Sequence, residues 1–161
     1  IRVGNQRGMM NFKKLREVAL STILLIISID VIFCMIFLFF NDFLPLLYLD
    51  PNNPSSLNDV NQVLEIASKL LIVAGVFQLF DGIQAVVLGA LRGMQDVNKP
   101  AIIIFLSYGV IGFPISYYLG FYTSLSMVGI WLGLLSGLFS SSLFLFLRFN
   151  YLSRKIIRLN D

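Results

Sequence analysis

Four long apolar runs, separated by shorter polar stretches, dominate the pattern of the chain. The runs cover residues 18–40, 70–91, 101–121 and 127–147. A helix needs roughly 20 consecutive apolar residues to cross the hydrocarbon core of a bilayer, and each run is long enough. We therefore predict an all-α fold, a polytopic membrane bundle of four transmembrane helices.

The composition supports a membrane protein and excludes several kinds of chemistry. The 161 residues are 57% hydrophobic and 13% charged, whereas soluble domains carry about 45–50% apolar and about 25% charged residues. The chain has no histidine, and its one cysteine, Cys34, lies inside the first apolar run. A Ser-His-Asp triad, an imidazole metal centre and a disulfide framework are excluded, and no glycine-rich phosphate loop is present. We predict that the chain is not an enzyme and uses no cofactor.

Charges in the connections predict the topology. Lys and Arg outnumber acidic residues in the segment 1–17, the connection 92–100 and the tail 148–161, whereas residues 41–69 hold four acidic residues and one lysine. Cytoplasmic connections carry the basic excess in membrane proteins. We therefore expect both ends of the chain to lie in the cytoplasm. Residues 41–69 would form an external connection, with a loop at 50–56 and the start of the next helix after it.

Asp81 is the first candidate for a functional residue, because it lies near the middle of the second apolar run. A carboxylate at the centre of a transmembrane helix costs roughly 3 kcal/mol of insertion free energy and usually faces a protein interior or a pathway. Helical geometry places Gln78 and Gln84 on either side of Asp81, with Phe77 on the same face. We predict that this stripe lines a cavity and takes up a cation or a proton. The alternative is a hydrogen bond to another helix for packing alone.

Two further residues are secondary candidates. Asp30 lies in the middle of the first run, where its helix neighbours, such as Ile26 and Phe33, are apolar. We expect a minor coupling role for Asp30, or a hydrogen bond to a neighbouring helix. Tyr108 lies deeper in the third run than the tyrosines near the membrane surface and is a further cavity-lining candidate.

The last two runs carry signals for packing and bending. A small residue recurs every four positions along the last run, a pattern that lets helices approach closely. Pro114 removes one helical hydrogen bond from the third run, so we predict a bend there. The small-residue positions are Gly129, Gly133, Gly137 and Ser141.

Several short motifs follow one another along the chain: RVGN at residues 2–5, FDGIQ at 80–84 with GALRG at 89–93, YGVIGFPISYY at 108–118, and GIW at 129–131. Together they resemble the multidrug and toxic compound extrusion (MATE) family of transporters, most closely its bacterial, NorM-type branch. The resemblance runs from Arg2 to about Phe149. It implies that the chain holds helices nine to twelve of a twelve-helix, two-lobed protein. Because the chain begins at Ile1, without a signal peptide, we expect the earlier helices to precede it.

The resemblance also implies a function. MATE transporters export bulky, often cationic drugs in exchange for inward Na⁺ or H⁺, and their C-terminal lobe commonly holds the coupling cation at a carboxylate of the tenth helix. Asp81 occupies that position. Phe77 occupies a position where some Na⁺-coupled members have tyrosine. The resemblance therefore leaves both Na⁺ and H⁺ as candidates for the coupling ion. The implied partners are the remaining helices of the same chain, the lipid bilayer and small-molecule drugs, with no nucleic acid. The implied location is the inner membrane of a bacterial cell.

Two other functions fit the sequence less well. A lipid-linked oligosaccharide flippase of the same superfamily would generally carry basic residues inside the lobe, and the four apolar runs contain no Lys or Arg. A complete four-helix subunit with a structural role would need its own start codon, and the chain begins at Ile1.

Overall fold

A computed structural model describes the chain at residues 1–47 and 57–160, apart from the side chains of residues 57–61. This part of the chain consists of helices joined by short turns. In chain order the elements are α1 (Arg2–Gly8), α2 (Phe12–Phe39), the 3-10 turn η1 (Leu44–Leu47), α3 (Leu57–Gly93), α4 (Asn98–Leu106), the π-helical segment η2 (Ser107–Gly112), α5 (Phe113–Phe121) and α6 (Ser126–Asn160).

Four helical stretches are long and apolar enough to cross a membrane, which confirms the predicted all-α membrane bundle. Two of them are much longer than their apolar runs, since α3 begins at Leu57 and α6 ends at Asn160. Their polar flanks contain Leu, Lys and Arg residues, which favour helix and let it continue past the apolar region. The loop predicted at residues 50–56 lies outside the described residues.

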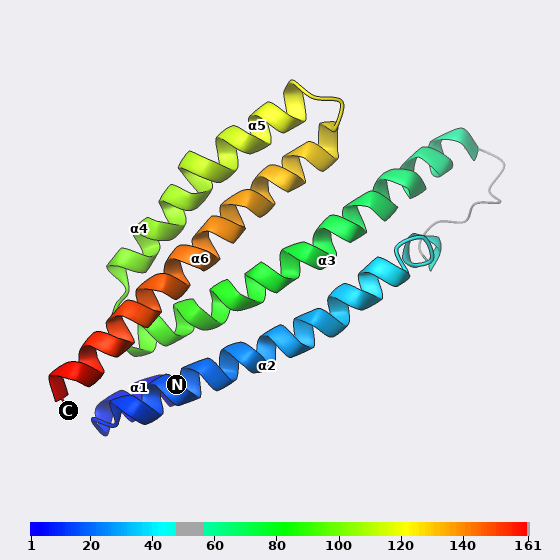
Figure 1. Ribbon diagram of the computed structural model, residues 1–161. Coiled ribbons are helices and arrows are strands. Elements are labelled where there is room, and N and C mark those ends of the chain that lie inside the picture. Colours follow the sequence, from blue (N-terminus) through cyan, green and yellow to red (C-terminus); the bar gives the residue numbers. More distant parts are fainter. Residues whose placement is uncertain (48–56, 161) are drawn as a thin grey trace.

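The helices form two hairpins, as Figure 1 shows. Helix α2 packs along α3, and the continuous rod α4–η2–α5 packs along α6. The hairpins meet through α3 and α6 near the end where both termini lie, and they diverge toward the tip of α5 (Figure 1). A buried apolar cluster fills the junction, formed by Leu15, Ala19, Ile23, Val87, Ala90, Leu91, Met94, Leu145 and Phe149.

The RVGN motif lies at the end of this junction. It forms the short helix α1, which lies against the end of α3. A Cβ added to Gly93 would lie 3.1 Å from the backbone nitrogen of Gly4 and from the Cβ of Val3. The two motifs RVGN and GALRG therefore meet in space, and glycine at position 93 permits the contact.

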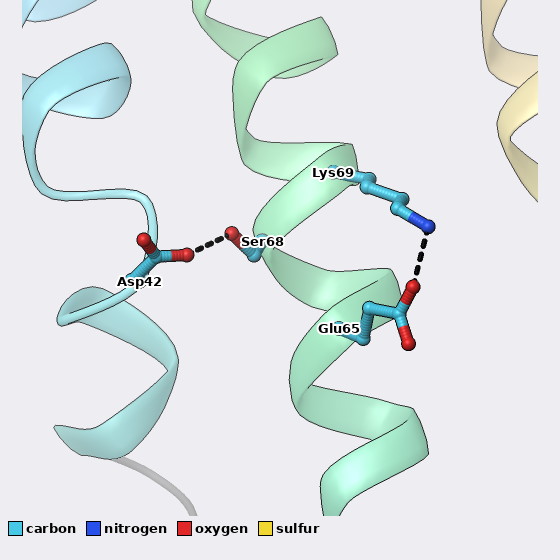
Figure 2. Close-up of polar contacts among 4 residues, drawn as sticks. All are labelled: Asp42, Glu65, Ser68 and Lys69. Atoms are coloured by element: carbon cyan, nitrogen blue, oxygen red, sulfur yellow. Dashed lines mark hydrogen bonds and ion pairs between the residues drawn. The ribbon is translucent and has the colours of Figure 1, made fainter.

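At the opposite end of the first hairpin, a polar contact joins the end of α2 to α3 (Figure 2). The Ser68 hydroxyl donates to the Asp42 carboxylate at 2.6 Å. In the same view, Lys69 and Glu65 form an ion pair of 2.6 Å one turn apart on α3. Both members of that pair are largely exposed, so we expect it to contribute little to stability.

The small-residue stripe of α6 lies against the preceding hairpin arm. Its four members are buried. A Cβ added to Gly133 would overlap the backbone of Ser116, whose hydroxyl donates to the carbonyl of Ile130 at 3.0 Å. Small side chains therefore allow backbone-to-backbone contact along this seam. The closest approaches pair Gly129 with Leu119, Gly133 with Ser116, and Gly137 with Gly112.

The region before Pro114, where we predicted a bend, contains the π-helical segment η2. The amide of Phe113 donates to the carbonyl of Tyr108, five residues earlier. Pro114 has no amide hydrogen, and its ring would clash with the carbonyl four residues before it in a regular α-helix. A π-helical turn widens the helix at this point, and such turns often occur at functional positions.

Polar contacts tie the helix ends together beside the apolar cluster. Arg148 of α6 binds Asp96 through two bonds, with Nε at 2.5 Å and Nη2 at 2.9 Å from the carboxylate. Arg16 of α2 donates to Ser153 at 2.7 Å and to Asn150 at 2.9 Å. These bonds connect α6 to the α3–α4 turn and to α2.

Candidate cation-coupling site

Asp81 lies in the middle of the membrane-spanning part of α3 and is exposed in the described part of the chain. One turn earlier, Phe77 is anchored by an edge-to-face contact with Trp131 of α6, with ring centroids 5.9 Å apart. Phe80 makes a similar contact with Phe139 at 5.0 Å. The aromatic contacts fix this part of α3 against α6 while leaving the Asp81 carboxylate accessible.

Asp30 of α2 lies beside the same turn of α3. Its Oδ2 atom is so close to Gly82 that a Cβ at that position would overlap it. The side-chain amide of Gln78 donates to the backbone carbonyl of Asp30 at 3.3 Å. The Asp30 carboxylate is also within electrostatic range of Asp81. Asp30 of α2 and Asp81 of α3, which lie in separate helices, are therefore close to the same turn of α3.

The neighbours of Asp30 on its own helix are apolar, as the sequence indicates, and a polar group reaches Asp30 from α3. The sequence signal was the FDGIQ motif itself, in which a glycine follows the aspartate and leaves room for a side chain from another helix. Asp30 Oδ2 is buried and has no hydrogen-bond partner among the described residues.

Tyr108 connects the second hairpin to this region. The half-buried tyrosine interacts with the Gln84 side-chain amide and lies within electrostatic range of Asp81. It also borders a largely apolar groove of about 620 Å³ between the α4–α5 arm and α6, together with Phe105, Phe113 and Tyr117. The five polar or aromatic candidates Phe77, Gln78, Asp81, Gln84 and Tyr108 thus gather around the middle of α3.

The donor set limits which ions this region can hold. Within the described ranges, no three acidic or cysteine side chains come together. Two carboxylates with amide and hydroxyl oxygens nearby suit a proton or a hard monovalent cation, because hard cations prefer oxygen ligands. A soft or strongly bound transition metal would need different donors.

Comparison with known proteins identifies the family. The MatE family profile matches residues 1–118. The chain belongs to the MatE family. The matched residues include both acidic residues of the site, Gln78, Gln84 and Tyr108, and they end within α5. MatE proteins are multi-pass membrane transporters rather than enzymes, in agreement with the predicted class.

Individual MatE relatives are similar over nearly the whole chain. Proteins named "Probable multidrug resistance protein NorM" are 35% identical in Agrobacterium fabrum, over 96% of this chain, and 34% identical in Rhizobium meliloti, over 97%. The Bacillus subtilis relative of the same name is 35% identical over 95% of this chain. The chain spans about a third of the length of these relatives, 32% in each case.

Proposed function

We propose that this chain is the C-terminal part of a multidrug antiporter that exports bulky, often cationic drugs in exchange for inward Na⁺ or H⁺. In this proposal Asp81 is the carboxylate that binds the coupling ion. The chain's similarity to multidrug resistance proteins supports the substrate class. The observation that carries the role of Asp81 is its position, mid-span on α3 and exposed beside Asp30.

In this proposal, neutralisation of the Asp81 charge couples entry of the ion to export of the drug. A carboxylate in the middle of a bilayer costs roughly 3 kcal/mol, and a bound proton or monovalent cation removes that charge. An inward-moving ion that neutralises Asp81 would favour one packing of the helices, and its release would favour another. A cationic drug competes for the same negative charge, so ion binding and drug binding exclude each other. Export of the drug is thereby coupled to entry of the ion.

Asp30 serves in this proposal as a second, weaker source of negative charge. Its carboxylate lies against Gly82, between two helices, whereas Asp81 is exposed. We therefore expect Asp30→Asn to reduce transport less than Asp81→Asn does. Gln78, which holds the backbone of Asp30, keeps α2 and α3 in register at this point.

The topology inferred from the charges belongs to the same proposal. Arg16, Arg148 and Asp96 cluster at the end of the bundle where the termini lie. The positive-inside rule favours the cytoplasmic side for this end. Asp81 would then lie about midway between the cytoplasmic cluster and the outer polar contact at Asp42.

The proposal is tested in cells that carry the full-length transporter. We expect Asp81→Asn to be expressed normally and to lose efflux of a fluorescent cation such as ethidium. Asp42→Asn is the matched control, because Asp42 lies beyond the end of α2 in a polar contact, and we expect it to retain efflux. Normal ethidium efflux by a normally expressed Asp81→Asn protein would refute the coupling role.

A further inference from the structure

An apolar groove lies between the two hairpins, apart from the groove that Tyr108 borders. Helix α3 packs along both α2 and α6 and lies between them in Figure 1. Phe80 and Ile83 of α3 line this groove together with residues of α2 and α6, and its volume is about 430 Å³. We call it the α2–α6 groove.

The shape of the α2–α6 groove suits an extended chain better than a helix. Its walls run from Leu20 to Ile27 on α2 and from Phe139 to Phe146 on α6, which is two helical turns or about 10 Å. The mean cross-section is therefore about 40 Å², whereas a helix with its side chains is about 10–12 Å across and occupies about 80 Å² or more. Leu24 in the α2 wall is exposed, so the groove is open at the surface of the described bundle.

One end of the α2–α6 groove leads directly to a cluster of polar side chains. Arg16 lies one turn before the groove residue Leu20 on α2, and the same helix face carries both. Asn150 has the matching position on α6, one turn after the groove residue Phe146. The Arg16 guanidinium donates to Asn150 at 2.9 Å and to Ser153 at 2.7 Å. Arg16 therefore places a positive charge between α2 and α6 at this end of the groove.

A second guanidinium lies close to the first. Arg154 of α6, one turn after Asn150, is exposed and within electrostatic range of Arg16. Among the described side chains, neither arginine forms an ion pair with an acidic residue, whereas Arg148 is paired with Asp96. Two positive charges held near each other repel, and a bound anion removes that repulsion. A phosphate suits them in particular, because two N–H donors of a guanidinium match two phosphate oxygens.

We propose that the α2–α6 groove binds an anionic phospholipid, with an acyl chain in the groove and the phosphate at Arg16 and Arg154. Basic pockets between transmembrane helices are typical sites for anionic lipid head groups, and here the basic pair continues directly from the apolar groove. In the proposed orientation, this lipid belongs to the cytoplasmic leaflet. It contacts α2 and α6 together and so links the first hairpin to the second.

The head group is tested by binding of dioleoylphosphatidylglycerol to the delipidated full-length transporter in a neutral detergent, measured by native mass spectrometry. We expect this lipid to bind at least about tenfold more tightly than dioleoylphosphatidylcholine, which has the same acyl chains and no net charge. Arg154→Gln should weaken phosphatidylglycerol binding by about tenfold, the loss expected for one charge-assisted hydrogen bond. Lys155→Gln is the matched control, because it removes the same charge at the next position, where Lys155 lies over the Tyr151 ring. We expect this control to bind as the parent does.

The acyl chain is tested by filling the groove. Leu24 lines the groove and is 66% exposed, whereas its neighbour Leu25 is 61% exposed and lies outside the groove lining. Leu24→Trp should weaken phosphatidylglycerol binding by about tenfold or more, because lost burial of two methylene groups already has that effect. Leu25→Trp adds the same bulk beside the groove, and we expect it to bind the lipid as the parent does.

Thermal unfolding in lipid-free detergent shows whether the variants fold. All four replaced side chains are exposed, so we expect each variant to match the Tm of the parent when lipid is absent. Phosphatidylglycerol should raise the Tm of the parent and of the two controls, Lys155→Gln and Leu25→Trp. It should raise the Tm of Arg154→Gln and Leu24→Trp less.

Equal affinity of the parent for the two lipids would overturn the inference. Parental affinity for phosphatidylglycerol in either the folded Arg154→Gln or the folded Leu24→Trp protein would also overturn it. If another helix of the full-length transporter covers the groove, Leu24→Trp will not change lipid binding, and the inference fails in the same way. The coupling role of Asp81 is independent of these outcomes, because ethidium efflux tests it separately.

Discussion

The carboxylate of Asp30 in α2 lies directly against the backbone of Gly82 in α3, at a point where a methyl group would overlap it. This contact joins two transmembrane helices at the level of the candidate cation site. It explains why a glycine follows Asp81 in the FDGIQ motif. Any larger residue at position 82 must displace Asp30 or separate the helices.

We predict that Gly82→Ala destabilises the full-length protein by about 1–3 kcal/mol, the usual cost of overpacking a tight interface. The measurement is the free energy of unfolding or the Tm in detergent. Gly89→Ala on the same helix is the control, because no atom of the described residues lies within 4 Å of a Cβ there. We expect Gly89→Ala to be neutral or slightly stabilising, since alanine favours helix over glycine. Equal stability of the two variants would show that α2 does not press on Gly82.

A parallel prediction concerns the seam between α5 and α6. Gly133→Ala should lower the Tm and reduce the yield of folded protein, because its Cβ would overlap the backbone of Ser116, which cannot rotate away. Gly109→Ala is the control, because the added Cβ there has no atom of the part of the chain that the structure describes within 4 Å. A Gly133→Ala protein as stable as Gly109→Ala would contradict the close backbone contact.

The ion pair between Arg148 and Asp96 should contribute measurably to stability. Its side chains are only 20% and 13% exposed, and the guanidinium makes two bonds to the carboxylate. Asp96→Asn should cost about 1.5–3 kcal/mol, the range for a hydrogen bond to a charged group. Lys69→Gln, which removes the exposed pair with Glu65, should leave the Tm unchanged. An equal effect of Asp96→Asn and Lys69→Gln on the Tm would contradict a stabilising role for the Arg148–Asp96 pair.

Thiol labelling can test the proposed topology. In a background with Cys34 replaced by alanine, a cysteine at Ser124 should react with an impermeant reagent added outside the cell. One at Leu159, which is 73% exposed, should react only after the membrane is opened. Ser153 is unsuitable as a reporter, because it is 1% exposed and bonded to Arg16. Labelling of Leu159→Cys in intact cells would reverse the proposed orientation.

The number of membrane helices was predictable from the sequence because insertion depends on the summed hydrophobicity of each run, which is a local property. The ends of the helices were less predictable, since the polar flanks of α3 and α6 continue as helix on their intrinsic propensity. The position of Asp81 in mid-span followed from counting along its run.

Relationships between helices were harder to predict, because they depend on how each helix is rotated about its axis. The sequence of α2 alone gave Asp30 only apolar neighbours, whereas α3 brings Gly82 and Gln78 to it. The sequence also gives no sign that the Ser141 hydroxyl lacks a hydrogen-bond partner among the described residues, since the serines around it in the same helix bond to their own backbone. The π-helical turn at Ser107 depends on the balance between Pro114 and the packing of Gly112 against Gly137.

The most direct test of the coupling role of Asp81 uses the purified full-length transporter in proteoliposomes with an imposed Na⁺ or proton gradient. We predict that the parent protein moves ethidium against its concentration gradient when the ion gradient is present. Asp81→Asn should show no gradient-driven movement, although the protein inserts normally, and Asp42→Asn should match the parent. Gradient-driven transport at the parental rate by Asp81→Asn would contradict the central claim.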